Sequence, residues 1–315
     1  MTGVARELAE VFGVGELVRI SPVARGAMGA VWELRTAEGV FAAKELFWFD
    51  GEVDSVLPEV AFRAACAESG VPSPAPLAAA NGKYVVRLGS RWWRLYEWAD
   101  GVAPGPQDAE ATAWLAAQMG VIHAIDWPGG STEVVPWYHR VDVDWPALVL
   151  EAKHARVEWA ERLDQLQPRL AELNSIVNTT PIGDQVWCHR DLRNSNVLRS
   201  GPNTLLVDWD NAGQLAPHRE LGALLMPYLH SPADLRQIAD AYRTAGGPGR
   251  IDDPSGFATG LAISLNFLHG QASAAMDDAV AEQHRTFAAQ QVVDLLDTLP
   301  TLELLEQAAT TIRST

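Results

Sequence analysis

The polar segment 188–198, Cys-His-Arg-Asp-Leu-Arg-Asn-Ser-Asn-Val-Leu, carries the strongest chemical signal in the chain. Asp191 stands five residues before Asn196, and Asp208 follows twelve residues after Asn196, at the end of the apolar run 205–207. A carboxylate, an amide and a second carboxylate in this order suit phosphoryl transfer, in which one acid orients the attacking hydroxyl and the other two side chains supply oxygen ligands to Mg²⁺. We therefore predict that Asp191 is catalytic and that Asn196 and Asp208 bind the metal.

A plainer interpretation exists for each of these residues taken singly. Asp and Asn are common turn formers, and His189 suits a buried packing position. The joint occurrence of acid, amide and strand-end acid in the required order favours the chemical interpretation. We expect His189 to anchor the loop by hydrogen bonds rather than to move protons, because Asp191 already fills the role of the base.

Two glycines upstream, Gly26 and Gly29 in the segment 24–31, form a pattern that resembles the glycine-rich nucleotide loop of kinases, with Ala24 in place of its first glycine. Glycine lets a backbone close over phosphates without a side-chain collision. Glycines at this spacing are also common in hairpins, so the pattern is weak unless the next strand carries a suitable cation.

Lys44 lies on that next predicted strand, where the kinase pattern has the residue that pairs with the nucleotide phosphates. Its neighbours, Phe41, Ala42, Ala43, Leu46 and Phe47, are apolar, and a buried ammonium group needs a partner. We predict that Glu59, in the first turn of the following helix, is that partner, with Glu68 as the second candidate.

The segment 94–101, Arg-Leu-Tyr-Glu-Trp-Ala-Asp-Gly, leads from a predicted strand to the point where the strand-like pattern of the sequence gives way to helical spacing. In the kinase fold this segment is the hinge, whose backbone amide and carbonyl groups face the adenine edge, and we assign Glu97 and Trp98 to this position. An ordinary linker between domains would occupy the same place in the sequence.

Taken in order from about Val18 to Gly222, these segments resemble the aminoglycoside phosphotransferase family, which consists of small-molecule kinases with a protein-kinase-like bilobal fold. Asp208 is followed by Trp-Asp rather than Phe-Gly, and no Ala-Pro-Glu element follows, so the resemblance is not to protein kinases proper. Pro217 and the triplet Glu-Leu-Gly at 220–222 match the pattern that follows the metal acid in the family, with Glu for the more usual Asp.

The resemblance implies ATP or GTP as phosphoryl donor, Mg²⁺ as cofactor, and Lys44 as the residue that steadies the nucleotide phosphates. Asp210 would assist a second metal ion or order the loop. Arg193 is unusual at its place, and we predict that it reaches the γ-phosphate as a fixed charge; the alternative is a structural pair with Asp210.

Patterning predicts the elements that position these residues. We expect an initial helix near residues 1–10, a hairpin from strands 31–36 and 40–46, a helix from Pro58 to Gly70, and strands at 84–88 and 92–98. Residues 1–99 would form a nucleotide-binding lobe, an antiparallel sheet with one main helix. Residues 100–315 would form a larger, mostly helical lobe for catalysis and acceptor binding, which makes the chain an α+β protein.

Helical spacing in the second part begins with Trp114, Gln118, Ile122 and Ile125, and recurs at Leu148, Ala152, Ala155, Trp159 and Leu163. The segment 254–276 has no Asp, Glu, Lys or Arg, yet its polar residues favour a buried helix over a membrane span.

The formal net charge of the 315 residues is −16, with 48% apolar and 20% charged positions, values that are normal for a globular protein apart from the acidic balance. A nucleic-acid surface needs clustered Lys and Arg, so we expect no nucleic-acid partner, and no anionic membrane surface for the same reason. The first ten residues carry Arg6, Glu7 and Glu10 and lack a signal-peptide core, and the two cysteines show no disulfide pattern. We expect a cytoplasmic enzyme whose oligomeric state is open.

The acceptor is the least determined partner. We expect a small molecule with a hydroxyl group, most readily an antibiotic of aminoglycoside, nucleoside or macrolide type. A metabolic acceptor such as choline, homoserine or a sugar would need the same catalytic residues. A catalytically silent nucleotide-binding module is the third hypothesis, and the presence of Asp191, Asn196 and Asp208 together argues against it. Acids at 142, 144, 151 and 158 and aromatic residues at 137, 138 and 145 are the candidates for acceptor contacts.

Overall fold

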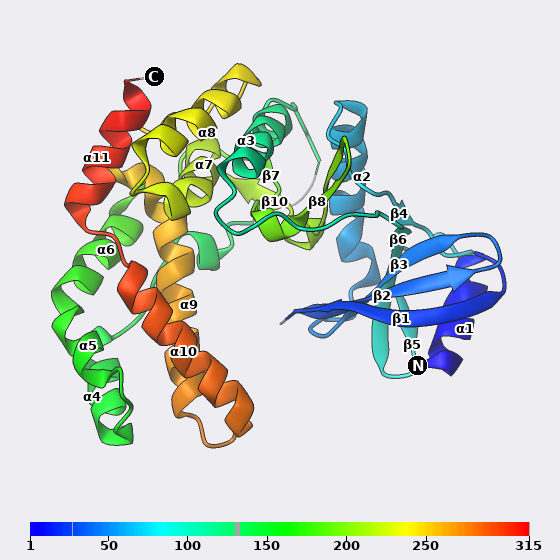
Figure 1. Ribbon diagram of the computed structural model, residues 1–315, viewed down its shortest axis with the longest axis horizontal. Helices are drawn as coiled ribbons and strands as arrows, with labels where there is room; N and C mark the ends of the chain where they lie inside the picture. Colours follow the sequence, from blue (N-terminus) through cyan, green and yellow to red (C-terminus); the bar gives the residue numbers. More distant parts are fainter. Residues whose placement is uncertain (27, 130–132, 315) are drawn as a thin grey trace. The chain divides into compact units, whose positions relative to one another are not determined.

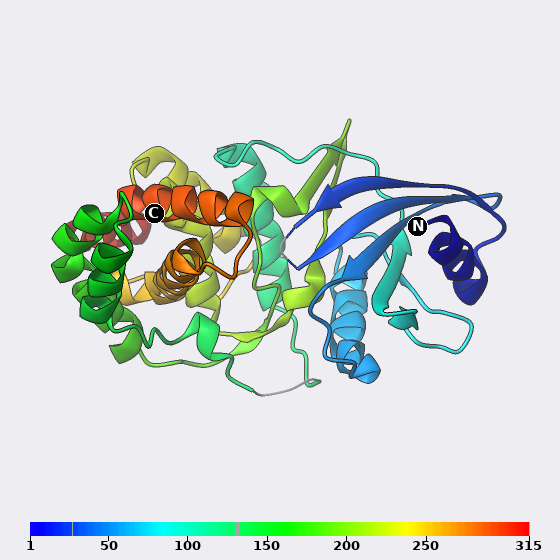
Figure 2. The same cartoon turned by 90° about the horizontal axis from the view of Figure 1, so that it is seen from below.

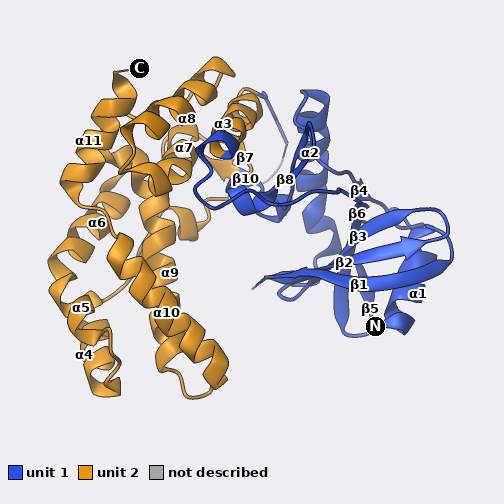
Figure 3. Ribbon diagram, in the orientation of Figure 1, with its two compact units in different colours: residues 1–111, 125–131, 191–213 blue, residues 112–124, 132–190, 214–315 orange. Residues whose placement is uncertain are grey.

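The computed structural model describes residues 1–26, 28–129 and 133–314. The chain divides into two compact units, neither of which is continuous in sequence (Figure 3). Unit 1 comprises Met1–Ala111, Ile125–Ser131 and Asp191–Gly213, and unit 2 comprises Thr112–Ala124, Thr132–Arg190 and Gln214–Thr315. The functional division at residues 99 and 100 stays a prediction.

Unit 1 contains the predicted antiparallel sheet, with strand order β1-β2-β3-β6-β4 and β5 paired to β6 (Figure 1). The strands are β1 Leu17–Arg25, β2 Gly29–Thr36, β3 Val40–Leu46, β4 Pro76–Leu77, β5 Val86–Leu88 and β6 Arg91–Glu97. Sequence patterning did not predict β1, which contains Pro22 and is mostly exposed. An edge strand tolerates proline because one row of its backbone groups is unpaired.

Two helices cover opposite faces of this sheet. Helix α1, Thr2–Phe12, packs through Leu8 and Phe12 against a core that contains Trp93 and Leu95 of β6. Helix α2, Leu57–Glu68, contacts Arg94, which lies between those two core residues and so points to the other face. The face toward α1 is therefore apolar, whereas the face toward α2 carries charge.

A second part of unit 1 comes from far along the chain. Strands β8, Val197–Ser200, and β9, Asn203–Leu206, form an antiparallel hairpin. The backbone N–H of Leu206 donates to the carbonyl of Pro72 at 2.8 Å, and Arg199 pairs with Val102 through two backbone hydrogen bonds. The hairpin is thereby tied to segments near the end of α2 and after β6.

Unit 2 is mostly helical, as predicted. Its helices are α3 Ala109–His123, which begins in unit 1, α4 Trp145–Ala155, α5 Ala160–Gln165, α6 Gln167–Thr179, α7 Pro217–Leu225, α8 Pro232–Thr244, α9 Ala258–Met276, α10 Glu282–Thr298 and α11 Leu302–Arg313. Strand β7, Val186–Cys188, pairs with β10, Gly213–Leu215. Short 3-10 turns occur at Val53–Val56, Pro136–Tyr138, Met226–Tyr228 and Pro254–Phe257.

The helical repeats of the sequence are confirmed with two adjustments. The repeat from Leu148 to Leu163 is divided between α4 and α5, because Arg156 adopts a left-handed conformation that ends α4. In α3 the buried face carries Leu115, Met119 and Ile122 rather than Trp114 and Gln118, and Ile125 lies beyond the end of the helix.

The uncharged segment forms α9, which lies beside α10 (Figures 1 and 2) and is buried along much of its length. Across the described residues, no helix combines the length and the apolar character that crossing a membrane requires.

Candidate active site

The catalytic loop, defined here as residues 191–196, is fixed by its own buried amide. Asn194 donates from Nδ2 to the backbone oxygens of Gly105, at 2.9 Å, and Asp108, at 3.1 Å. A 3-10 turn, Asn194–Asn196, then leads into β8. Buried amides of this kind hold a loop rigid because leaving them unpaired is costly.

Asp191 and Asn196 are in direct contact within this loop. Asn196 donates from Nδ2 to the backbone oxygen of Asp191 at 2.8 Å and to its Oδ2 at 3.1 Å. Arg193 donates to the same Oδ2 at 2.9 Å, so the alternative prediction of an Arg193 pair with Asp210 is wrong. Since the amide of Asn196 is planar, its Oδ1 points away from Asp191.

Asp208 follows the open end of the β8–β9 hairpin, next to the segment of Asn196. The N–H of Val207 donates to the carbonyl of Asn196 at 2.9 Å, which brings the two predicted metal ligands onto neighbouring strands. Asp208 has φ 66°, in the left-handed region that residues other than glycine seldom adopt. The 3-10 turn Trp209–Asn211 follows directly.

The buried side chain of Trp209 anchors this turn. Its indole donates to Ser73 Oγ at 3.0 Å, and the ring is 1% exposed. Arg63 of α2 donates to the same Ser73 oxygen at 3.1 Å, and its guanidinium lies 6.0 Å from the Trp209 ring centroid. The strained conformation of Asp208 is therefore supported by packing from α2.

Lys44 faces the two acids that flank Trp209. Its Nζ lies 2.6 Å from Asp208 Oδ1 and 2.8 Å from Asp210 Oδ2. The side chain of Lys44 is 14% exposed, whereas the side chains of Asp208 and Asp210 are 38% and 29% exposed. Lys44 is therefore largely shielded from water, as its apolar neighbours predicted.

The predicted pair between Lys44 and Glu59 is wrong. Glu59 pairs instead with Arg94, whose NH2 lies 2.6 Å from Glu59 Oε2 and whose NH1 lies 2.9 Å from Asp210 Oδ1. Arg94 stands directly opposite Lys44 in the β3–β6 register. Its longer, forked side chain reaches the acid of α2, while the acids near Trp209 take Lys44. We call Lys44, Glu59, Arg94, Asp208 and Asp210 the charge cluster.

The charge cluster shifts the titration of its members. Burial alone would raise the pKa of Asp210, but Lys44 and Arg94 attract the carboxylate and lower that pKa overall. Burial alone would lower the pKa of Lys44, but Asp210 and Asp208 raise it overall. For Glu59, burial raises the pKa despite the opposing charge of Arg94. Lys44 and Asp210 are therefore both held in their charged forms.

Of the two predicted loop glycines, Gly26 lies between β1 and β2, and Gly29 is the first residue of β2. A Cβ on Gly29 would stand 2.4 Å from the backbone oxygen of Glu45, so this glycine is required by the close pairing of β2 with β3. Gly26 donates from its N–H to the carbonyl of Gly29 at 2.9 Å. The residue between them at position 27 is outside the described residues, and the role of the loop in nucleotide binding stays a prediction.

The two predicted hinge residues lie at the end of β6, with Glu97 its last residue and Trp98 directly after it. The N–H of Glu97 donates to the carbonyl of Ala75 at 2.9 Å, and the N–H of Ala75 donates to the Glu97 carboxylate at 3.0 Å. The indole of Trp98 donates to Asp100 Oδ1 at 2.7 Å. The Glu97 amide is thus already paired within unit 1, and a nucleotide contact would have to use the backbone that follows it.

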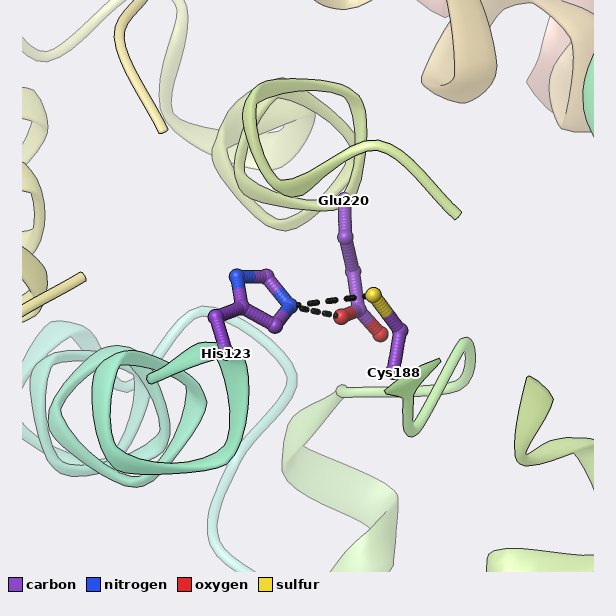
Figure 4. Close-up of side chains that lie close together, drawn as sticks. All are labelled: His123, Cys188 and Glu220. Atoms are coloured by element: carbon purple, nitrogen blue, oxygen red, sulfur yellow. Dashed lines mark hydrogen bonds and ion pairs between the residues drawn. The ribbon is translucent and has the colours of Figure 1, made fainter. Parts of the chain in front are cut away.

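Unit 2 contains a second polar cluster, which is buried and includes Cys188, three residues before the catalytic loop (Figure 4). His123 Nε2 lies 2.6 Å from Glu220 Oε2, and the other oxygen of Glu220 accepts the backbone N–H of Arg190. Cys188 Sγ lies 3.2 Å from the same His123 nitrogen. We call His123, Cys188, Glu220 and Tyr242 the histidine network.

Hydrogen bonds link the members of the network. The hydroxyl of Tyr242 accepts from the N–H of Gly249 at 2.9 Å and lies 3.0 Å from His123 Nδ1. The carboxylate of Glu220 accepts from the opposite ring nitrogen, Nε2. Burial and the nearby Glu220 raise the pKa of Cys188 well above its ordinary value, and the thiol lies 3.3 Å from the carbonyl of Leu215.

The histidine network is therefore a support for the chain at Arg190, which has φ 63°. His123, Cys188 and Glu220 are residue types that also ligate metals. The separations of 2.6 and 3.2 Å between their donor atoms are those of hydrogen bonds, and shorter than the spacing of ligands around a tetrahedral ion whose metal–ligand bonds are about 2.0–2.3 Å long.

The candidates for acceptor contacts have other roles or remain exposed. Asp144 caps α4 by accepting the N–H of Ala147 at 3.0 Å, and exposed Asp142 pairs with Arg140. Tyr138 and Trp145 are buried, whereas Trp137 is 43% exposed. Among the aromatic candidates, Trp137 alone offers substantial surface for stacking.

Sequence reasoning missed Arg94 as a site residue. The signal was present, because Arg94 sits in the apolar run 92–96 and falls on the same sheet face as Lys44 once β3 and β6 are paired in register. A buried arginine in a central strand needs acidic partners.

Comparisons with solved structures show proteins of the same fold. A spectinomycin phosphotransferase in complex with ADP and spectinomycin is 13% identical, with a TM-score of 0.67 and coverage of 96% of this chain and 98% of that chain. An amicoumacin kinase in complex with AMP-PNP and Ca²⁺ is 17% identical, with a TM-score of 0.61 and coverage of 95% and 94%. A choline kinase from Cryptosporidium parvum is 14% identical, with a TM-score of 0.55 and coverage of 100% and 99%.

These structures share the kinase-like α+β fold with this chain. The family model of the phosphotransferase enzyme family matches residues 19–255, which include the whole charge cluster and the catalytic loop. With three quarters of its length matched, the chain belongs to the phosphotransferase enzyme family.

Proposed function

We propose that the protein transfers the γ-phosphoryl group of ATP or GTP to a hydroxyl group of a small molecule, and that this acceptor is an antibiotic. One observation carries the proposal: Asp191 and Asn196 are in contact, and a backbone hydrogen bond from Val207 sets Asp208 beside them. The arrangement supplies an acid for the hydroxyl and oxygen donors for a metal within one compact unit.

Asn196 and Asp208 fit a magnesium site by their chemistry. Asn196 uses its nitrogen in two hydrogen bonds to Asp191, so its carbonyl oxygen faces away from Asp191, and the Asp208 side chain is 38% exposed. Both are hard oxygen donors of the kind that Mg²⁺ prefers. Both oxygens of Asp210 accept hydrogen bonds from cations, so we assign it to ordering the loop in preference to a second metal. When bound, the metal neutralises charge on the phosphates.

The other residues orient the two substrates. Asp191 accepts the hydroxyl proton of the acceptor, while Arg193, whose side chain is 64% exposed, has room to swing toward a transferred phosphoryl group. Lys44 offers its ammonium group to the nucleotide phosphates from strand β3. Gly26 and Gly29 border the loop that joins β1 to β2. The backbone beyond Glu97 and Trp98 would meet the base.

The experiment is a phosphoryl-transfer assay with radiolabelled ATP and GTP against a panel of hydroxyl-bearing antibiotics and metabolites. Asp191→Ala should lower transfer by about 10³-fold or more, because the base and its orientation are both lost, and should leave the dissociation constant of the nucleotide within about threefold. Asp54→Ala, which removes an exposed acid paired with Lys83, is the matched control and should leave both quantities unchanged. Robust turnover by Asp191→Ala would overturn the assignment.

A metabolic acceptor such as choline, homoserine or a sugar is the second candidate. The likeness to a choline kinase over the whole chain favours it, and it requires the same catalytic residues. Expression in an antibiotic-sensitive bacterium separates the two. Resistance to one antibiotic class supports the antibiotic acceptor, and uniform sensitivity together with transfer to a metabolite supports the second. Thermal stabilisation by Mg-ATP without transfer to any acceptor would indicate a silent nucleotide-binding module.

A further inference from the structure

The paired strands β3 and β6 place two cations side by side. Lys44 and Arg94 are directly opposite each other in the antiparallel register, so their side chains leave the same face of the sheet. Arg94 is 2% exposed and Lys44 is 14% exposed. Like charges at opposed positions destabilise a sheet, and burial makes the repulsion stronger. This pair persists only because acids are arranged around it.

Those acids form a continuous chain of contacts with the cations. Glu59 pairs with Arg94, Arg94 with Asp210, Asp210 with Lys44, and Lys44 with Asp208. Asp210 is the shared link, since its Oδ1 accepts from Arg94 and its Oδ2 lies against Lys44. The hydroxyl of Tyr96 also lies 3.4 Å from Oδ1, and the Tyr96 ring packs 5.1 Å from the Arg94 guanidinium.

We propose that Arg94 is a positioning residue for the phosphotransferase reaction, which holds Asp210 from the side opposite to Lys44 and so fixes the Lys44 ammonium toward the nucleotide phosphates. Glu59 then acts on Lys44 only through Arg94 and Asp210. The inference rests on the proposed function, and it deepens that function by adding a residue that touches no substrate.

Arginine suits this position because its fork offers two donors at a fixed angle. One donor reaches Glu59 at 2.6 Å and another reaches Asp210 at 2.9 Å, a bridge that a single ammonium group would make poorly. A plain structural ion pair would involve Glu59 alone. The second contact, which points to the site and not to the helix, distinguishes a positioning role from such a pair.

The experiment separates stability from positioning with a double substitution. Arg94→Met leaves Glu59 buried without a partner and should lower the urea midpoint of unfolding. Arg94→Met combined with Glu59→Met replaces the buried pair by apolar side chains of similar length, which commonly restores stability. The double variant should therefore recover the midpoint while the KM for nucleotide stays raised about tenfold and kcat stays lowered about tenfold, because Asp210 and Lys44 are still misplaced.

Two further variants complete the test. Arg94→Lys keeps the charge but loses the fork, and should show an intermediate KM. Arg91→Met lies on the same strand and removes an ion pair with Glu45 on the other face, so it should leave KM and kcat unchanged. A double variant with a restored midpoint and wild-type KM and kcat would overturn the proposal and leave Arg94 a structural ion pair. If the double variant unfolds, Arg94→Lys takes its place in the test. Wild-type KM and kcat for Arg94→Lys would then equally overturn the proposal.

The proposed function itself is tested by measuring nucleotide binding and phosphoryl transfer with the wild-type chain. Should the wild-type chain bind nucleotide but transfer nothing, the same variants are compared by their nucleotide dissociation constants from calorimetry, where the tenfold loss is still expected. Failure of the wild-type chain to bind either nucleotide would overturn the proposed function and the role of Arg94 together.

Discussion

The charge cluster of unit 1 and the histidine network of unit 2 are both built from ionisable side chains, yet they differ in how water reaches them. In the charge cluster, the side chains of Asp208 and Asp210 keep 38% and 29% of their surface exposed. In the histidine network, His123 is fully buried and the Glu220 carboxylate is 4% exposed. The first cluster carries five formal charges on five side chains, whereas the second is a chain of hydrogen bonds with a neutral thiol beside it.

This difference assigns the two clusters to different tasks. A partly hydrated carboxylate that loses its protein partner can be solvated by water, so a substitution there costs little stability and changes mainly what the site can bind. A buried carboxylate that loses its partner keeps the full cost of desolvation. We therefore expect substitutions of Lys44, Asp208 and Asp210 to affect mainly activity, and those in the histidine network to affect folding. Substitution within the buried Glu59–Arg94 pair should affect both.

The largest effect on stability is expected for Glu220→Ala. The substitution leaves His123 Nε2 and the N–H of Arg190 buried without their acceptor. We expect the free energy of unfolding to fall by about 3–5 kcal/mol, measured by urea denaturation. Asp142→Ala, which breaks the exposed pair with Arg140, should leave it unchanged within the error of the measurement. Similar losses of stability for Glu220→Ala and Asp142→Ala would contradict the role assigned to the histidine network in folding.

Lys44→Met should give the opposite profile. The two acids that lose the ammonium group are partly exposed, so we expect a loss of stability of about 1 kcal/mol or less, while kcat/KM for nucleotide falls by about 100-fold or more. Steady-state kinetics and urea denaturation on one preparation measure both. Lys83→Met, which removes an exposed pair with Asp54, is the control for loss of a surface lysine. A stability loss comparable to that of Glu220→Ala would show that hydration does not protect the charge cluster.

The pH dependence of stability should carry the signature of the charge cluster. The folded pKa of Asp210 lies below its unfolded value, so this carboxylate contributes stability that is present above the unfolded pKa of about 3.9 and is lost as the pH falls through the folded pKa. Lys44 has a raised folded pKa and contributes stability that is lost as the pH rises through it, beyond about 10.4.

The measurement is the difference in free energy of unfolding between wild type and Asp210→Asn, followed from pH 7 down to pH 3. The difference should shrink as the pH falls below about 4. A difference that grows with acidity would contradict the assigned direction of the shift. Asp142→Asn serves as the matched acid in an exposed pair.

The smallest effect concerns the thiols. Burial raises the pKa of Cys66 to about 12 and that of Cys188 well above its ordinary value, and both side chains are fully buried. The two cysteines should remain unmodified by an aromatic disulfide reagent at pH 8 in the folded protein, and both should react in urea, as read by absorbance. Reaction of Cys188 within minutes in the folded state would show that the histidine network opens to solvent.

The sequence predicted those elements and contacts that depend on local pattern. Residues 40–46 form an apolar, β-rich run that follows the short connection at 37–39, and the strand was found at those bounds. Helix α2 has a proline in its first turn and a glycine after its end, and it begins and ends within two residues of the prediction. The contact of Asp191 with Asn196 follows from their spacing in one loop.

Local patterns of this kind could not predict the contacts that depend on strand register. The partner of Lys44 was predicted from the order of acids along the chain, which favoured Glu59, but the actual partners lie 164 and 166 residues away at Asp208 and Asp210. Choosing among three acids requires knowing that Arg94 stands opposite Lys44 and takes Glu59 first. Strand β1 was missed because its burial is slight and Pro22 interrupts its alternation.

The discontinuity of unit 1 has a consequence for synthesis of the chain. When the ribosome has released residues 1–111, the sheet can assemble with Glu59 against Arg94, but the two carboxylates that neutralise Lys44 are still unmade. They emerge only with the segment 191–213, after roughly a hundred further residues at about 5–20 residues per second. During those seconds Lys44 of the nascent sheet lacks its acidic partners, and the surface that will later pack against Trp209 is uncovered. We therefore expect the growing chain to be most prone to misassociation in this interval.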